Sequence, residues 1–354
     1  MADRLHVHLQ TNITVHIKLS HVSTARCRRS FGGRNKAMMD NKSSVLYLAT
    51  FEAPYPVQVL IFSLCLAIYL TTTAANLLVL VTVAVSTDLH KPMHIFLCNL
   101  VIGDIIGSTG GLPKQLHVLL TGNREIMFIP CVAQMFTLHT FAINEIFTLA
   151  LMSVDRYLAI CYPLHYRTKV TAKRSIFIAL LSWLISIISV SIQATFLLSI
   201  TLKENNRQIQ GIACDNVGIV SLAANDTSEI EMYGKSKIFL TVGFPFCVIA
   251  FTYVRILVEC KNSNSTEFRS KALHTFGTHF MALAVFFTVL FLDILLPRFV
   301  KNADSEGVGN LRSSVQLVFL LSPVANVLIY CLRTTELRLA ISKHFKEISP
   351  RVHS

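Results

Sequence analysis

The sequence predicts an all-α membrane protein, a bundle of seven transmembrane helices followed by a short amphipathic C-terminal helix in the cytoplasm. The first observation behind this prediction is composition. Of 354 residues, 53% are hydrophobic and 15% are charged, and the mean hydropathy is +0.55. Soluble domains carry about 25% charged residues. The chain therefore lacks the surface of a soluble enzyme, and it does not have the composition of a disordered chain or a secreted disulfide scaffold.

The second observation is a series of long apolar stretches. Five contain no Asp, Glu, Lys or Arg, and two more are each interrupted by one acid, Asp104 or Glu145. Crossing a bilayer core of about 30 Å takes roughly 20 apolar residues in an α-helix. Soluble core helices, the competing interpretation, are shorter and amphipathic. In chain order, the expected spans are about 57–85, 93–120, 130–161, 175–202, 236–260, 272–298 and 312–332.

The positions of Lys and Arg predict the orientation, because cytoplasmic loops are enriched in both. With a cytoplasmic C-terminus, the inner segments hold 15 basic residues and the outer ones 17, of which seven precede residue 40. Without these seven, the inner side is the more basic one. We therefore expect a multi-pass plasma-membrane protein with an extracellular N-terminus. Its net charge of +12 then indicates topology and contact with membrane lipid, not nucleic acid binding.

The first 38 residues differ from the rest, with scattered histidines and arginines and no apolar core of a signal peptide. Translation could begin at Met38 or Met39. We expect four regions: a gene-model extension or disordered tail at 1–38, an extracellular N-terminus at 39–56, the seven-helix domain at 57–332 and a cytoplasmic tail at 333–354. Asn41, in the sequon Asn41-Lys-Ser43, is the expected glycosylation site.

Most of the nine cysteines lie inside expected spans, where a thiol behaves as a small apolar group. Cys131, at the start of the third span, and Cys214, in the expected loop 203–235, face the oxidising side. They are either joined by a disulfide that ties the loop over the bundle or left as two free thiols. The cysteine spacing does not fit a metal site.

Four polar side chains lie deep in expected spans: Asn76, Asp104, Glu145 and Asn326. Acids inside a membrane are rare and usually functional. The four either meet in the bundle interior and bind water, a cation or a shared proton, or each makes a separate structural hydrogen bond.

Asp155-Arg156-Tyr157 ends the third span on the expected cytoplasmic side. From Cys131 to Arg156 an α-helix rises about 37 Å, so one helix reaches both membrane interfaces. Arg156 is either an anchor that reaches the lipid head groups or a switch held by Asp155 and released when helices move.

Three motifs identify what this pattern resembles. Residues 153–166 read SVDRYLAICYPLHY, close to MAxDRYxAICxPLxY; residues 89–97 read LHKPMHIFL, close to LHxPMYxFL; and Lys271-Ala-Leu-His-Thr with His279 is similar to KAxxTCxxH. Over about residues 40–345 the chain therefore resembles the rhodopsin-family G-protein-coupled receptors, and within them the odorant receptors, most of all the fish-type ones.

The resemblance implies that the protein binds a small odorant in the outer half of the bundle and activates a stimulatory olfactory G protein. It implies a disulfide between Cys131 and Cys214 and no cofactor beyond a sodium ion at Asp104 and Glu145. The implied sites are a G-protein switch (Asp155, Arg156, Tyr157, Tyr330), a cation and water site (Asn76, Asp104, Glu145, Asn326) and ligand contacts (Met135, His139, Ile143, Phe287, Leu290, Ile294).

One departure concerns the seventh span, where Val327 stands in place of the family's proline. A valine restores a backbone hydrogen bond and should reduce the local kink.

Two alternative functions remain: a rhodopsin-family receptor for a ligand that is not an odorant, and a transporter or channel with Asp104 and Glu145 on its ion path. No inverted repeat supports the transporter. No nucleophile–base set or phosphate loop points to an enzyme.

Overall fold

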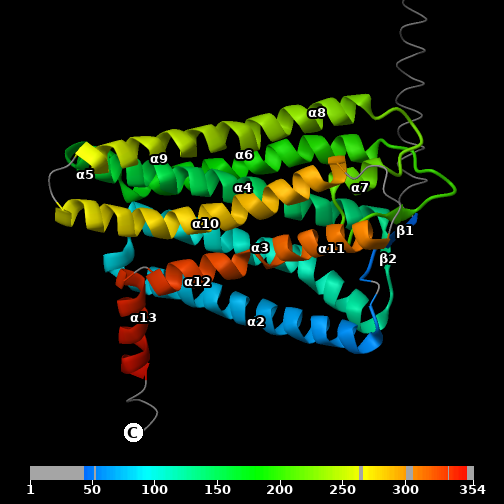
Figure 1. Ribbon diagram of the computed structural model, residues 1–354, viewed down its shortest axis with the longest axis horizontal. Coiled ribbons are helices and arrows are strands. Elements are labelled where there is room, and N and C mark those ends of the chain that lie inside the picture. Colours follow the sequence, from blue (N-terminus) through cyan, green and yellow to red (C-terminus); the bar gives the residue numbers. More distant parts are fainter. Residues whose placement is uncertain (1–43, 52, 263–265, 300–305, 334, 349–354) are drawn as a thin grey trace, which may run out of the picture.

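The computed structural model describes residues 44–51, 53–262, 266–299, 306–333 and 335–348. Within them, long helices lie side by side in a bundle (Figure 1). The segment 1–38 and Asn41 lie outside the described residues. The seven spans of the bundle are α2 (Tyr55–Val85), α3 (Pro92–Thr121), α4 (Phe128–Cys161), α6 (Ala172–Leu198), the run of α8 (Ser228–Ile238), η2 (Phe239–Gly243) and α9 (Phe244–Asn262), α10 (Thr266–Phe299), and the pair α11 (Glu306–Leu321) and α12 (Pro323–Arg333).

Short elements cap the two ends of the bundle. β1, β2 and α7 lie at one end, and α5 and α13 lie at the other, where α13 runs across the direction of the bundle (Figure 1). We call them the sheet end and the Arg156 end. The short elements are β1 (Val45–Leu48), η1 (Thr87–Leu89), β2 (Glu125–Met127), α5 (Pro163–Lys169), β3 (Gln208–Ile209), α7 (Asn216–Val220) and α13 (Thr335–Ile348).

The predicted all-α membrane bundle is confirmed. Among the described residues, six helical stretches are long and apolar enough to cross a membrane, and α10 contains a shorter apolar stretch, Phe280–Leu295. The most apolar part of α4 is 72% buried, against 22% for α2 and 28% for α6. Helix α4 is therefore central, whereas α2 and α6 expose leucine and isoleucine side chains that suit a lipid environment.

The two ends of α3 show how local sequence sets helix limits. Pro92 opens the helix, where its fixed φ fits and its missing N–H is not needed. Gly122 closes it with a φ of 70°, a left-handed conformation that costs a side-chain-bearing residue energy.

A small sheet at the sheet end was not expected from the sequence. Strand β1 lies between β2, to which it is antiparallel, and β3, to which it is parallel. Leu46 and Leu48 are fully buried beneath it, while Tyr47 faces outward. The segment before the first span is therefore folded onto the bundle, because its alternating leucines have an apolar surface to cover.

The limits of the fourth and fifth spans differ from those predicted. Helix α6 ends at Leu198, not 202, and the fifth span begins at Ser228, not 236. Beyond α6 the chain turns, and Leu202 pairs with Ala223 in a β-bridge. The connecting loop is therefore 199–227, shorter than the expected 203–235. Absence of charge marks the segment that fits in lipid, whereas the helix itself continues wherever its hydrogen bonds can form.

The seventh span is broken between α11 and α12. The break lies at Ser322, immediately before Pro323, whose ring fits the first turn of a helix but whose nitrogen cannot donate a hydrogen bond. Helix α12 continues without interruption through Val327. The chain thus has its discontinuity one turn before the position where a family proline was expected.

Candidate functional site

Three of the four predicted membrane polar residues meet at the centre of the bundle. Asn326 Nδ2 on α12 donates to Glu145 Oε1 on α4 at 2.8 Å and to Asp104 Oδ1 on α3 at 3.1 Å. All three side chains are at most 3% exposed. Asn76 is also fully buried, but neither its oxygen nor its nitrogen has a hydrogen-bond partner among the residues that the structure describes. One amide therefore bridges two acids, and Asn76 is not part of this network.

The two acids of this cluster need a compensating positive charge or a proton. Two carboxylates that share one donor in a low-dielectric interior repel each other unless a proton or a cation compensates their charge. Within the described part of the chain, Glu145 Oε2 is buried without a hydrogen-bond partner, as are both polar atoms of the Asn76 side chain. The residues therefore fit a small hard cation with water, or a shared proton.

At the Arg156 end, Asp155 holds two partners. Arg156 donates to Asp155 Oδ2 from Nη2 at 2.5 Å and from Nε at 3.1 Å. The hydroxyl of Tyr166 on α5 donates to Asp155 Oδ1 at 2.8 Å. Burial, followed by the Asp155 charge and this hydrogen bond, raises the pKa of Tyr166, so its phenol remains a donor at neutral pH. Asp155 is 3% exposed, so water cannot readily replace its two partners. Its carboxylate therefore holds Arg156 in place.

The two predicted tyrosines of the switch lie apart from Asp155. Tyr157 Oη donates to Tyr162 Oη at 3.5 Å on an exposed surface. Tyr330 is 2% exposed, and its hydroxyl lies 4.0 Å from the sulfur of Met152. Tyr166 was missed as a partner because its hydrogen bond spans 11 residues and depends on the short helix α5.

At the sheet end, Cys131 and Cys214 form a disulfide with a Cα–Cα distance of 5.4 Å. The same loop is held by contacts that the sequence analysis did not predict. Gln134 Oε1 accepts from the Cys214 backbone N–H at 3.0 Å, and Arg312 on α11 pairs with Asp215 at 2.9 Å. Gln316 Oε1, also on α11, accepts from the Ile212 N–H at 2.8 Å. Loop 199–227 is thus fastened to both α4 and α11.

The predicted ligand residues fall into two apolar groups. Met135 and Ile143 pack in a cluster with the disulfide, β1 and loop 199–227. Phe287 and Leu290 belong to a second cluster that also contains residues of α3, α4 and α9, and Ile294 packs against this cluster. The structure therefore does not join the third-span and sixth-span sets in one apolar cluster.

His139, the predicted polar contact, has two polar partners instead. Its Nδ1 lies 3.3 Å from Gln193 Oε1 on α6 and 3.1 Å from Lys237 Nζ on α8. Lys237 is 8% exposed and also donates to Gln193 Oε1. Lys237 was not among the predicted site residues, although it lies at the start of the expected span 236–260. The signal that could have found it is its place directly before a charge-free stretch.

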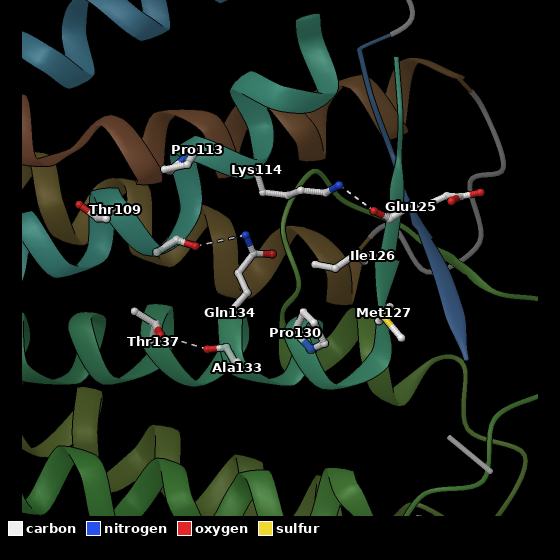
Figure 2. Close-up of a pocket in the computed structure, with 11 residues that line it drawn as sticks. Thr109, Pro113, Lys114, Glu125, Ile126, Met127, Pro130, Ala133, Gln134 and Thr137 are labelled. Carbon is white, nitrogen blue, oxygen red and sulfur yellow. Dashed lines mark hydrogen bonds between the residues drawn. The ribbon is translucent and has the colours of Figure 1, made fainter. Parts of the chain in front are cut away.

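An open groove of about 590 Å³ lies between α3, β2 and α4. Figure 2 shows Lys114 reaching toward Glu125 across it, and the two are joined by a hydrogen bond from Lys114 Nζ to the Glu125 carbonyl at 2.6 Å. Gln134 points toward α3 and donates to the Gly110 carbonyl at 3.3 Å. The six predicted ligand residues do not line this groove.

Comparison with known proteins gives consistent results. A family model described as "Olfactory receptor" matches residues 64–348. Human olfactory receptor 10A6 is 32% identical over 285 residues, covering 80% of this chain and 88% of that receptor. Mouse olfactory receptor 7A40 is 30% identical over 286 residues, covering 81% and 91%.

Among solved structures, squid rhodopsin superposes with a TM-score of 0.66 at 16% identity, covering 85% of this chain and 91% of that one. This likeness concerns the fold. The named relatives are human and mouse receptors, so the fish-type resemblance stays a prediction.

Proposed function

Because the chain belongs to the olfactory receptor family, we propose that it binds a small odorant and responds by activating a stimulatory olfactory G protein. In this proposal the sheet end faces outside and the Arg156 end faces the cytoplasm. The ligand binds beneath loop 199–227. Membership of a receptor family favours this function over that of a transporter or channel. We expect no enzymatic activity. Among receptor ligands, family membership favours an odorant.

The observation that carries the proposal is the Asp155–Arg156 pair. A guanidinium held by a nearly fully buried carboxylate at the end of the central helix is a stable resting arrangement. The same carboxylate also accepts from Tyr166 on α5, so a movement of α5 relative to α4 changes how Asp155 holds Arg156. If Arg156 served only as a lipid anchor, there would be no need for Tyr166 to fix the carboxylate of Asp155 that holds it.

The proposed mechanism is a population shift. A ligand that binds the active arrangement more tightly than the resting one moves the equilibrium by its difference in affinity. In the active arrangement Arg156 leaves Asp155 and becomes available to a G protein at that end.

We assign a supporting role to the Asp104–Asn326–Glu145 cluster. It joins α3, α4 and α12 near the middle of the bundle, between the ligand end and the Arg156 end. A sodium ion with water, or a shared proton, would stabilise the arrangement in which the three helices stay close. We also assign Asn76 a water-mediated contact, since its buried amide has no direct hydrogen-bond partner among the described residues.

The test is the substitution Arg156→Ala in a cell line with a cyclic-AMP reporter, stimulated with a mixture of small odorants. We expect the odorant-evoked cyclic-AMP rise of the unmodified protein to be lost while surface expression remains measurable. Arg174→Ala is the matched control, because Arg174 is an exposed arginine at the same end of the bundle. An undiminished response in Arg156→Ala would contradict the switch.

A further inference from the structure

Lys237 places an amine inside the bundle near the sheet end. It is 8% exposed, and its Nζ contacts His139 Nδ1 at 3.1 Å and Gln193 Oε1. The three residues come from α8, α4 and α6. His139 lies two helical turns beyond Cys131, about 12 Å along α4. The amine is therefore located beneath the loop that the disulfide fastens.

The partners of this amine are neutral acceptors. Among the described residues, no carboxylate oxygen lies within the 4.0 Å ion-pair distance of Lys237 Nζ. An ammonium has three hydrogens to donate: Gln193 Oε1 accepts one, and His139 Nδ1 accepts a second when the imidazole carries its proton on Nε2. Buried charges in proteins are normally paired with an opposite charge, because the transfer of an unpaired charge out of water is strongly unfavourable. A carboxylate bound at Lys237 would supply the opposite charge.

The backbone next to Lys237 forms a π-helical turn, which supports a binding site at this position. The π-helical turn η2 begins two residues later, at Phe239. Thr241 in this turn donates its hydroxyl to the Lys237 carbonyl at 2.8 Å. Such turns insert a residue into a helix and are frequent at functional sites.

The surroundings of the cluster are apolar. On α4, Met135 and Ile143 lie one turn to either side of His139, and both are buried. On α6, Val190 and Leu197 flank Gln193 in the same way, also buried. A hydrocarbon chain attached to an anion would find apolar contacts on both sides.

We infer that Lys237, with Gln193 and His139, recognises the carboxylate of a small aliphatic ligand. The inference rests on the proposed receptor function and names the chemical class of its ligand. The carboxylate accepts the third hydrogen of the Lys237 ammonium, and the alkyl chain packs along α4 and α6. Amines of the same length are disfavoured, because they would bring a second positive charge to the lysine.

The test uses straight-chain carboxylates from butanoate to decanoate, each with the alcohol and the amine of the same chain length. Cyclic-AMP responses are measured in reporter cells. Binding is measured separately, as the shift in unfolding temperature of the purified protein. We expect the carboxylates to act at lower concentrations than the matched alcohols, and the amines to be the weakest.

The decisive variants are Lys237→Met and Lys237→Arg. Lys237→Met should weaken the carboxylate response and binding roughly 10- to 100-fold, the range for a hydrogen bond to a charged group, and leave the alcohols nearly unchanged. Lys237→Arg should retain the preference for carboxylates. Lys235→Met is the control, since Lys235 is an exposed lysine two residues away that pairs with Glu231. It should behave as the unmodified protein does.

The outcomes separate this inference from the proposed function. If the protein responds to odorants but no carboxylate is preferred, or if Lys237→Met weakens alcohols and carboxylates equally, the carboxylate site is wrong and the receptor function stands. If carboxylates stabilise the purified protein in a Lys237-dependent way but evoke no cyclic-AMP rise, the site is right and the proposed coupling is wrong.

Discussion

Single polar residues connect the helices of this bundle. Trp183 Nε1 on α6 donates to Asn99 Oδ1 on α3 at 2.7 Å, and Asn99 Nδ2 donates to Thr148 Oγ1 on α4 at 2.7 Å. Ser182 Oγ on α6 donates to Asn144 Oδ1 on α4 at 2.8 Å. A buried polar group gains from these bonds because lipid offers no alternative partner. Residue identity at such positions therefore determines which helices are joined.

The Asp104–Asn326–Glu145 cluster, with its proposed sodium ion, predicts a dependence of stability on sodium. We expect the unmodified protein to unfold at a higher temperature in sodium chloride than in choline chloride, because sodium would bind only the folded state. The gain would be about 2.7 kcal/mol at a sodium concentration 100 times its Kd. Asp104→Asn should abolish the difference, and Asp88→Asn, at an exposed acid, should keep it.

The measurement is thermal unfolding of purified protein in the two salts at equal ionic strength. Equal unfolding temperatures for the unmodified protein, or a sodium effect that survives in Asp104→Asn, would contradict a sodium site and favour the shared proton.

Two glycines on α3 give a second residue-scale prediction. A Cβ at Gly107 would overlap the ring of Phe141, which is 1% exposed and packs against Phe319. A Cβ at Gly103 would meet its nearest atom, Asn144 Nδ2, at an ordinary 3.5 Å. Gly107→Ala should therefore destabilise the protein by about 1–3 kcal/mol through overpacking. Gly103→Ala should be neutral or slightly stabilising, because alanine favours helix. Thermal unfolding of the two variants measures the difference. Equal losses of stability would refute the steric overlap between a Cβ at Gly107 and Phe141.

At the scale of elements, loop 199–227 covers the sheet end of the bundle and is held there by four side-chain attachments. The disulfide and Gln134 fasten it to α4, and the Asp215–Arg312 pair, with Gln316, fastens it to α11. Strand β1 adds the segment before α2 through its pairing with β3. The loop therefore couples the positions of α4 and α11 at the sheet end.

Removing the disulfide should loosen this loop. We expect the double substitution Cys131→Ser and Cys214→Ser to lower stability by about 2–5 kcal/mol and to reduce surface expression, because it frees a loop closed over 83 residues. Cys247→Ser, at an exposed free cysteine on α9, is the control and should have no comparable effect. Surface labelling and thermal unfolding measure both. Equal stability of the double variant and the control would show that Gln134 and Arg312 suffice.

At the scale of the whole molecule, orientation is the property to test. The distribution of Lys and Arg predicts that the Arg156 end faces the cytoplasm. An epitope tag placed after Ser354 should be labelled in cells only after permeabilisation, and a tag inserted in loop 199–227 should be labelled on intact cells. The opposite pattern would reverse the proposed directions of ligand and G-protein binding.

Periodicity and motif were enough to predict several features of this protein. Seven apolar segments determined the bundle, because a membrane-spanning helix satisfies all its backbone hydrogen bonds by itself. Residues 153–166 predicted the family, which the comparisons confirm. The pairing of Cys131 with Cys214 followed from the resemblance, and the structure contains it.

The sequence by itself determined the number of spans, the family and the buried acids, because composition and short motifs are local properties of the chain. Only the tertiary structure decided which side chains meet. It brought Asn326 to Asp104 and Glu145 but left Asn76 unpaired, folded β1 onto the loop, and buried Lys237 beside His139 and Gln193. The physical reason is that helix rotation and the limits of helices, such as the early start of α8, depend on packing between distant segments, which no local pattern records.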